Sequence, residues 1–262
     1  MIGRAAARLV MEIYAGPFQV DLKGPNDPVT RADREANALI CRMLEERFPD
    51  AALIAEESVP GPTEVAALVG RERVFFVDPL DGTREFVDKN GEFAVMIGMC
   101  VSGRPTLGVV VAPVTGDAFA GRAGPAPIAF REDSHGVRTA LAPSEVTDPA
   151  KATLAVSRSH RPQVADRVRD RLGITRELQL GSVGLKAARV ATGEVDLYVH
   201  GGGCKRWDTC GPEAILVAAG GRFTGLGGAS IDYTSPDLVV RGGLIASSVG
   251  LYDAALAAAR AP

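Results

Sequence analysis

The chain carries two aspartates directly behind an apolar run, and this placement constrains the fold more than any other feature. In "VFFVDPLDGTREF", residues 74–86, four apolar residues precede Asp78, and a proline, Asp81 and Gly82 follow within four positions. A short apolar run bounded by turn residues is typical of a buried strand. The sequence therefore predicts a strand that ends in a stiff turn, with two carboxylates three residues apart.

Two interpretations fit this stretch. In the structural one, the carboxylates of Asp78 and Asp81 cap backbone amides of the turn, as aspartates in turns commonly do. In the functional one, both carboxylates and the backbone carbonyl of Leu80 bind a hard cation such as Mg²⁺, which prefers oxygen ligands. The residue types alone leave both interpretations open.

Further acidic residues stand at the ends of other predicted elements. Glu56 and Glu57 close the short apolar stretch "AALIA", and Asp208 lies in "KRWDTCGPE". Asp33 lies in the first turn of a helix predicted for residues 31–48, where apolar residues recur at three- and four-residue spacing. Each has a structural alternative: a solvated pair for the glutamates, a helix cap for Asp208 and a capping box for Asp33. Their shared placement at element boundaries makes a divalent-cation site a reasonable hypothesis.

The rest of the chain predicts two halves of different kind. "FAVMIGMCV" and "LGVVVAPV", separated by "SGRP", indicate an antiparallel hairpin, and residues 121–150 are rich in glycine, proline and charge, which indicates an irregular crossing. Beyond it, strand-like pieces ("TLAVS", "VDLYVH" and "GGLIASS") alternate with helical ones ("PQVADRVRDRLG", "GLKAARVATG", "PEAILVAAGG" and "LYDAALAAAR"). We therefore expect an α+β fold with an N-terminal α+β domain, residues 1–145, which supplies most metal ligands, and a C-terminal α/β domain, residues 146–262, which completes the site.

Composition excludes several classes of protein. The formal net charge of the 262 residues is -3 and the basic residues are scattered, so no general attraction to nucleic acid or to a membrane surface is expected. Residues 1–16 contain Glu12 inside an apolar stretch, which favours an amphipathic helix over a signal peptide. The four cysteines form no CxxC pair. We expect reduced thiols and a cytoplasmic location.

Four blocks, taken together and in order, resemble the lithium-sensitive, Mg²⁺-dependent phosphomonoesterase superfamily of inositol monophosphatases, fructose-1,6-bisphosphatases and 3'(2'),5'-bisphosphate nucleotidases. They are "DPVTRAD" (27–33), "IAEES" (54–58), "DPLDGTREF" (78–86) and "WDTCGPE" (207–213). The resemblance spans most of the chain and implies a layered α/β/α/β/α fold. Within the superfamily it is closest to the nucleotidases, because Glu85 stands where the monophosphatases typically have asparagine.

The resemblance also implies roles for individual residues. Two or three Mg²⁺ ions would be held by Glu56, Asp78, the Leu80 carbonyl, Asp81 and Asp208, with Glu57 in a supporting position. Asp33 and Thr83 would form a hydrogen-bonded pair that orients and deprotonates the attacking water. The amides of Gly82 and Thr83 would hold the phosphate, and the remaining substrate contacts would come from His160, Ser182, Lys186, Asp208 and either Lys205 or Arg206.

The implied reaction is hydrolysis of the 3'-phosphate of adenosine 3',5'-bisphosphate to AMP and phosphate, as in sulfur metabolism. An inositol monophosphatase or fructose-1,6-bisphosphatase activity is the first alternative, and a non-catalytic nucleotide or cation sensor is the second. "GSVGLK" has one more residue between Ser182 and Lys186 than some members of the superfamily carry. Trp207 is expected to pack beside the site rather than stack on a base. Relatives commonly form homodimers, so a homodimer is also an expectation.

Overall fold

The computed structural model describes residues 1–25, 27–159 and 161–260 of the chain. Its largest sheet has seven strands in the order β3-β4-β5-β6-β7-β8-β9. β3 and β4 are parallel and every other neighbouring pair in this sheet is antiparallel. The strands are β3 (Ala52–Ala55), β4 (Arg73–Asp81), β5 (Ala94–Val101), β6 (Arg104–Ala112), β7 (Asp117–Arg122), β8 (Ile128–Glu132) and β9 (Arg138–Ala140).

The hairpin predicted on either side of "SGRP" is confirmed as β5 and β6, but the prediction of an irregular crossing over residues 121–150 is wrong in part. Strands β8 and β9 and the end of β7 lie in that segment. The glycines and prolines belong to the turns between short strands at the edge of the sheet, where partial burial leaves only a weak apolar pattern. The sheet is therefore wider than the sequence pattern indicated.

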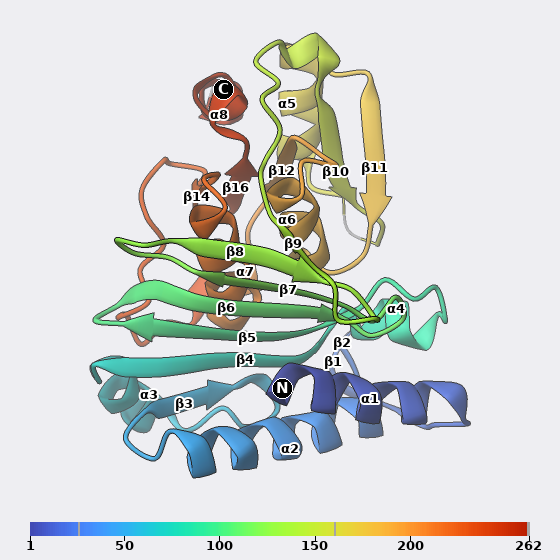
Figure 1. The fold of residues 1–262 in the computed structure, drawn as a ribbon, viewed down its shortest axis with the longest axis vertical. Coiled ribbons are helices and arrows are strands. Elements are labelled where there is room, and N and C mark those ends of the chain that lie inside the picture. The colour runs from blue at the N-terminus through green and yellow to red at the C-terminus, as the bar shows by residue number, and fades with distance from the viewer. Residues whose placement is uncertain (26, 160, 261–262) are drawn as a thin grey trace.

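Two amphipathic helices, α1 (Ile2–Ala15) and α2 (Arg31–Arg47), cover one face of this sheet and confirm the two N-terminal helices that the sequence predicts. Their buried residues pack with the inward side chains of β4 to β6 in one apolar cluster that includes Val10, Ile40, Val77 and Ile97. Figure 1 shows α1 and α2 at one end of the molecule, opposite the C-terminal helix.

Helix α7 (Arg206–Ala218) packs against the opposite face of the sheet, where it lies over a row of three glycines. Gly98 on β5 pairs with Gly108 on β6, which pairs in turn with Gly121 on β7. A Cβ atom on Gly108 would lie 2.0 Å from the carbonyl oxygen of Gly211, and one on Gly121 would lie 2.5 Å from the Cα of Ile215. The helix backbone therefore lies directly on the sheet, and only glycine is small enough for these positions.

A second sheet of five strands has the order β11-β10-β12-β16-β14. The strands are β10 (Thr153–Ser157), β11 (Arg176–Leu180), β12 (Leu197–His200), β14 (Arg222–Gly225) and β16 (Leu244–Ser247). β10 is parallel to β11 and β12, whereas β16 is antiparallel to β12 and β14, so this sheet is mixed. The helices predicted around it are confirmed as α5 (Gln163–Leu172), α6 (Val183–Ala191), α7 and α8 (Val249–Arg260), although α7 begins well before the predicted "PEAILVAAGG".

The two sheets share a core. One apolar cluster joins Met96 and Phe119 of the first sheet to Ala188 on α6, Ile215 on α7 and Tyr198 of the second sheet. A separate cluster lies between the second sheet and helices α5 and α8. The order of layers is therefore helices α1 and α2, the seven-stranded sheet, α6 and α7, the five-stranded sheet, and α5 and α8 (Figure 1). The predicted layered α/β/α/β/α fold is confirmed.

Shorter elements complete the chain. They are the hairpin β1 (Val20–Gly24) and β2 (Asp27–Thr30), the pair β13 (Cys204–Lys205) and β15 (Val239–Val240), helices α3 (Pro62–Val69) and α4 (Thr83–Val87), and the 3-10 turns η1 (Glu56–Ser58) and η2 (Pro149–Lys151). No helix in the described part of the chain is both long and apolar enough to cross a bilayer.

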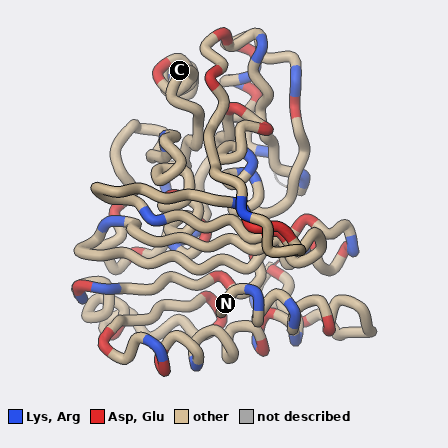
Figure 2. The backbone as a smooth tube through the Cα atoms, in the orientation of Figure 1, with Lys and Arg blue, Asp and Glu red and all other residues tan. Residues whose placement is uncertain are grey.

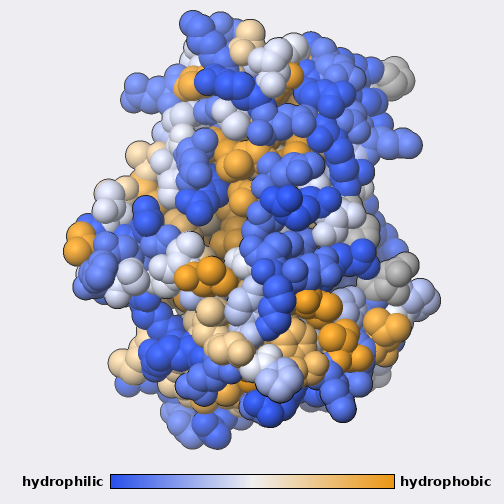
Figure 3. Space-filling view, turned by 90° about the vertical axis from the view of Figure 1, so that its right-hand side faces the viewer, coloured by the Kyte–Doolittle hydropathy of each residue, from blue (hydrophilic) through white to orange (hydrophobic). Residues whose placement is uncertain are grey.

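Charged residues of both signs are distributed along the chain, as Figure 2 shows, which agrees with the scattered pattern in the sequence. The face drawn in Figure 3 is largely hydrophilic, and its apolar residues gather at mid-height and in the lower half. The charges that bear on function are therefore those that the fold brings together locally, and these lie at the C-terminal end of β4.

Candidate active site

The acidic stretch that the sequence singled out belongs to the end of β4 and the start of α4. The predicted turn after Val77 is instead an irregular continuation of the strand: Asp78 pairs with Met96 and Asp81 pairs with Ala94, so β4 holds one residue more than β5 between these pairs. Side chains in a regular strand alternate between faces, so residues three apart point to opposite sides. The extra residue is a β-bulge, which reverses this alternation and allows both carboxylates to face the same region.

Asp33 and Thr83 meet as the resemblance implied. The Thr83 hydroxyl lies 2.8 Å from Oδ1 of Asp33 and 3.1 Å from the Leu80 carbonyl oxygen, and it can donate to either. Oδ2 of Asp33 accepts hydrogen bonds from the amide and the hydroxyl of Thr30, both at 2.7 Å. The capping box proposed as the structural alternative is therefore present, and the second carboxylate oxygen is left for Thr83. Burial raises the pKa of Asp33 although these hydrogen bonds oppose the shift.

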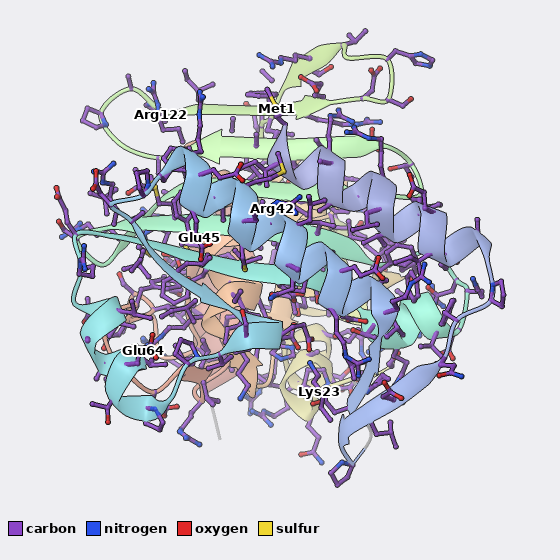
Figure 4. All side chains as sticks on the ribbon, turned by 90° about the horizontal axis from the view of Figure 1, so that it is seen from below. Met1, Lys23, Arg42, Glu45, Glu64 and Arg122 are labelled. Atoms are coloured by element: carbon purple, nitrogen blue, oxygen red, sulfur yellow. The ribbon has the colours of Figure 1, made fainter. Side chains whose placement is uncertain are left out.

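Glu56 and Glu57 follow β3 in η1 and face the hairpin β1–β2. The ammonium group of Lys23 lies 2.8 Å from Oε1 of Glu56 and 2.7 Å from Oε1 of Glu57. Although burial acts in the opposite direction, the charges of the two glutamates raise the pKa of Lys23. Figure 4 labels Lys23 beside this hairpin, on the side of the molecule away from Met1. A cationic group therefore already bridges the two glutamates.

Asp208 is the third residue of α7, and its Oδ2 accepts the backbone N–H of Lys205 at 2.7 Å. Burial, then the charges of Asp81 and Glu56, raise the pKa of Asp208 well above its usual range. Burial, then the charges of Glu56, Asp81 and Asp208, do the same for the pKa of Asp78. Four carboxylates from β3–η1, β4 and α7 therefore act on one another across the junction of the two sheets.

These residues fit a hard divalent cation by their chemistry. All the donor atoms are oxygens, the mutual repulsion of buried carboxylates is relieved by a bound cation, and the Lys23 ammonium shows that the glutamates accept one. Within residues 1–25, 27–159 and 161–260, no three acidic, imidazole or thiol groups are gathered into a ready-made metal cage. Asp81 contributes to this, because its Oδ2 is already occupied: it accepts hydrogen bonds from the Ser182 hydroxyl and, at 2.8 Å, from the Gly184 amide.

The predicted substrate contacts lie in different surroundings. Gly82 adopts a left-handed conformation with φ of 94° between the strand and α4, which suits a backbone that turns sharply after Asp81. Ser182 accepts the Leu185 amide while it donates to Asp81. Lys186 is buried, and its ammonium donates to the carbonyls of Leu180 and Gly181. Burial lowers the pKa of Lys186 to about 8.

The remaining residues predicted near the substrate differ in burial and in their partners. Lys205 is half-buried beside Asp208, whereas Arg206 is buried and donates to the Ser235 carbonyl on the long segment before β15. His160 lies outside the described residues. Trp207 is buried in an apolar cluster with Ile54 and Tyr233, as the packing interpretation predicts. The four cysteines are free thiols, although the sulfur atoms of Cys100 and Cys210 lie 3.5 Å apart.

Some neighbours of the site were absent from the sequence prediction. The sequence gives no signal for Lys23 or Glu92, because each is a common surface residue whose partner is distant in the chain. For Glu85 the sequence indicates only the family pattern, whereas in the structure Glu85 is buried and accepts the Ser159 hydroxyl at 2.6 Å. The glycine between Asp81 and Thr83 was the one available signal that the residues after β4 approach other backbone closely, since a Cβ there would lie 3.1 Å from the Glu92 carbonyl.

Comparisons with known proteins agree with this fold and site. The model of the inositol monophosphatase family matches residues 2–261. The chain is 36% identical over 235 residues to the 3'(2'),5'-bisphosphate nucleotidase CysQ of Escherichia coli strain K12, covering 89% of this chain and 91% of that protein. Among solved structures, the extragenic suppressor protein suhB of Bartonella henselae matches with a TM-score of 0.81 at 25% identity, covering 99% of this chain and 95% of that one. CysQ of Bacteroides thetaiotaomicron matches with a TM-score of 0.78 at 26% identity, covering 94% of each chain.

Proposed function

The chain belongs to the inositol monophosphatase family, and we propose that it is a Mg²⁺-dependent phosphatase that hydrolyses adenosine 3',5'-bisphosphate to AMP and phosphate. The observation that carries the proposal is the meeting of two groups at the end of β4. One is the set of four mutually repelling carboxylates, Glu56, Asp78, Asp81 and Asp208, and the other is the hydrogen-bonded Asp33–Thr83 pair beside them.

The proposed metal ligands are the four carboxylates and the backbone carbonyl of Leu80, with Glu57 in support. Bound Mg²⁺, as two or three ions, supplies charge neutralisation for the phosphoryl oxygens and lowers the pKa of a coordinated water. Without a bound cation, the carboxylates give the region a negative charge. In that state Lys23 donates hydrogen bonds to Glu56 and Glu57. The Gly82 and Thr83 amides are proposed to orient the transferred phosphate.

The Asp33–Thr83 pair is proposed to hold the attacking water and to accept its proton. Burial raises the pKa of Asp33, which makes its carboxylate a better proton acceptor than an exposed aspartate. Thr30 fixes Oδ2, so that Oδ1 remains directed at the Thr83 hydroxyl. The threonine oxygen can then accept a hydrogen bond from the water while its own proton is directed at Asp33.

A pair of substitutions at Thr83 tests this role. Thr83→Val keeps the shape and removes the hydroxyl, so kcat should fall by about 10²- to 10⁴-fold, the range of a lost proton-transfer group. Thr83→Ser keeps the hydroxyl and should retain most of the activity. Equal kcat values for the valine variant and the wild type would exclude the hydroxyl from proton transfer. Circular dichroism and thermal unfolding would show that both variants fold.

The nucleotide substrate is supported by Glu85, which follows the nucleotidase pattern, and by the name of the relative from Escherichia coli. Inositol monophosphate and fructose 1,6-bisphosphate are the alternatives, and the name of the matching family supports the first of them. Phosphate release from the three compounds at equal Mg²⁺ concentration decides between them. The nucleotidase proposal requires the highest kcat/KM for adenosine 3',5'-bisphosphate. Binding without turnover of all three would instead support the sensor alternative.

The remaining expectations stay proposals of the same kind. We propose a cytoplasmic location and a role in sulfur metabolism, inhibition by lithium at low millimolar concentration, and a homodimer in solution. Lithium titration of phosphate release and light scattering of the purified protein test the last two. A lithium-indifferent enzyme would weaken the assignment within the superfamily.

A further inference from the structure

Three acids, one at the end of β4 and two after it, face hydrogen-bond donors from the second half of the chain. We name this set the seam: Asp81, Glu85 and Glu92 on one side, and Arg158, Ser159, Gly181, Ser182 and Gly184 on the other. Asp81 is a proposed metal ligand, so the seam begins at the candidate active site. Its far end, Glu92 with Arg158, has no role in the function proposed above.

Glu92 accepts more of these hydrogen bonds than the other two acids of the seam. Its two oxygens accept the Arg158 guanidinium as a fork, with Nε to Oε2 at 2.7 Å and Nη2 to Oε1 at 2.6 Å. Oε2 also accepts the Gly181 amide at 2.7 Å. Burial would raise the pKa of Glu92, but the bonds from Arg158 and Gly181 outweigh it and hold that pKa below its usual range. One carboxylate therefore joins two loops of the C-terminal half.

The loops that Glu92 joins are those after β10 and after β11. Arg158 and Ser159 follow β10, and Gly181 and Ser182 follow β11 at the start of α6. The fit is close, since a Cβ on Gly181 would lie 2.4 Å from Cγ of Glu85 and 2.6 Å from the Glu92 carbonyl oxygen. On the other side, a Cβ on Gly82 would lie 3.1 Å from the Glu92 carbonyl oxygen and 3.3 Å from Oε2 of Glu85. Gly82, which is proposed to orient the transferred phosphate, is therefore packed close to Glu85 and Glu92, the same acids that hold the two loops.

We propose that Glu92 and Arg158 are positioning residues for the part of the substrate beyond the transferred phosphate. The metal ligands and the Asp33–Thr83 pair need only the phosphate, whereas Ser182 and Lys186, which are proposed contacts to the rest of the substrate, follow β11 in the C-terminal half. The Glu92–Arg158 fork sets the distance between those loops and the end of β4. This inference rests on the proposed phosphatase function and extends it to the residues that select a large substrate over a small one.

Substitutions in the fork test the inference without touching a metal ligand. Glu92→Gln keeps an acceptor for Gly181 but removes the charge, and Arg158→Met keeps the chain length but removes the donors. Each variant should raise the KM for adenosine 3',5'-bisphosphate and the Kd for AMP by roughly tenfold, as expected for a charge-assisted forked pair that is partly exposed. The kcat for the nucleotide and the kcat/KM for glycerol 2-phosphate should stay within about threefold.

Two controls separate positioning from general loosening. The effect of the double variant should fall well short of the sum of the two single effects, because each single variant already weakens the Glu92–Arg158 fork; Arg158→Met also loses its bond to the Gln179 carbonyl. Glu177→Gln breaks the fork between Arg161 and Glu177, at 2.9 and 2.5 Å, whose partners both belong to the C-terminal half, and it should leave the KM unchanged. Hydrogen exchange should quicken at residues 157–159 and 179–182 of Arg158→Met, with β5 unaffected. If Glu92→Gln fails to fold, the test uses Arg158→Met instead. The Arg158 side chain is 41% exposed in the wild type, so its replacement should leave the fold intact.

The outcomes for this inference differ from those for the proposed function. Wild-type turnover of the nucleotide tests the function alone, and if fructose 1,6-bisphosphate proves the better substrate, the same variant ratios are measured with it. Equal losses for large and small substrates, additive effects in the double variant, or the same KM change in Glu177→Gln would each overturn the positioning role. A selective, non-additive rise in KM for the large substrate would support it.

Discussion

At the scale of single residues, the structural and the chemical interpretation of an acid turn out to coexist. Asp33 and Asp208 are both third residues of helices, and both accept the amide at the start of their helix through one oxygen. A carboxylate has two oxygens, so a cap uses one and leaves the other for Thr83 or a cation. The sequence offered the two roles as alternatives because it shows residue types and spacing, and the same residue satisfies both.

Asp78 provides the clearest test at this scale. Replacing it by asparagine removes a buried charge from the group of four carboxylates, so activity should fall by about 100-fold or more while the metal-free protein becomes more stable. Burial, then the neighbouring charges, raise the pKa of Asp78, so the wild type loses stability as the pH rises from the unfolded-state value toward that raised pKa. The advantage of the variant should therefore be small in acid and grow toward neutral pH.

Thermal unfolding in a chelator, at several pH values, measures this advantage. A gain of about 1 kcal/mol corresponds to roughly 2–4 °C for a chain of this size. Asp50→Asn, at an exposed position after α2, is the matched control and should change nothing. A lower melting temperature for Asp78→Asn would mean that the charge on Asp78 strengthens the hydrogen bond from the Leu80 amide by more than the repulsion costs.

At the scale of elements, α7 connects the site to the large sheet. It brings Asp208 to the end of β4, and it does so by lying on the row of Gly98, Gly108 and Gly121. In the sequence these glycines look like interruptions of three strands, and the long "RWDTCGPEAILVA" helix contains a glycine and a proline that hide its start. These positions require glycine because helix and sheet lie so close together, and only the tertiary structure shows this close packing.

Gly108→Ala should displace α7. The new Cβ would stand 2.0 Å from the Gly211 carbonyl, which cannot move without moving the helix. We expect a loss of about 3 kcal/mol or more in the free energy of unfolding, at the upper end for overpacked cores, together with weaker Mg²⁺ binding because Asp208 shifts. Gly227→Ala, where nothing lies within 4 Å, is the control. Denaturant unfolding and calorimetric Mg²⁺ titration measure the two effects, and a stable variant would show that the helix can shift at little cost.

The same helix carries a buried acid that titrates near neutral pH. Burial raises the pKa of Glu213 to about 8, and the Tyr233 hydroxyl lies 2.7 Å from its carboxylate. Because the folded pKa lies above the unfolded one, the native state binds the extra proton, and stability should decline between about pH 4.5 and 8. Glu213→Gln keeps the hydrogen bond without the titration. Its melting temperature relative to the wild type should rise across this window, and a constant difference would contradict the shift.

At the scale of the whole molecule, the two sheets share a core and a site. The division at residues 145 and 146 remains a proposal for the chain's organisation. The apolar cluster between the sheets takes side chains from both sides of that boundary, and α7 from the second half covers a face of the first sheet. Neither half buries its own apolar surface alone, so we expect them to depend on each other for stability.

Separate expression of residues 1–145 and 146–262 tests this dependence. Each fragment should lack cooperative unfolding and expose apolar surface to a fluorescent dye, and mixing them should restore a single transition if they associate. The intact chain serves as the control in the same buffer. A fragment that unfolds cooperatively on its own would show that one half is an independent domain.

The sequence by itself determined the types of the main elements, the family and the identities of the acids, because these depend on local periodicity and on short blocks such as "DPLDGTREF". It missed β8, β9, β11 and β14, whose short stretches are mostly exposed or half-buried and carry little apolar alternation. It also missed β7, which is mostly buried but consists largely of alanine and glycine. Only the tertiary structure decided that a bulge turns Asp78 and Asp81 toward one region, that Lys23 bridges two glutamates and that Glu92 holds Arg158. These are contacts between residues far apart in the chain, and no local pattern encodes the partner of a surface charge.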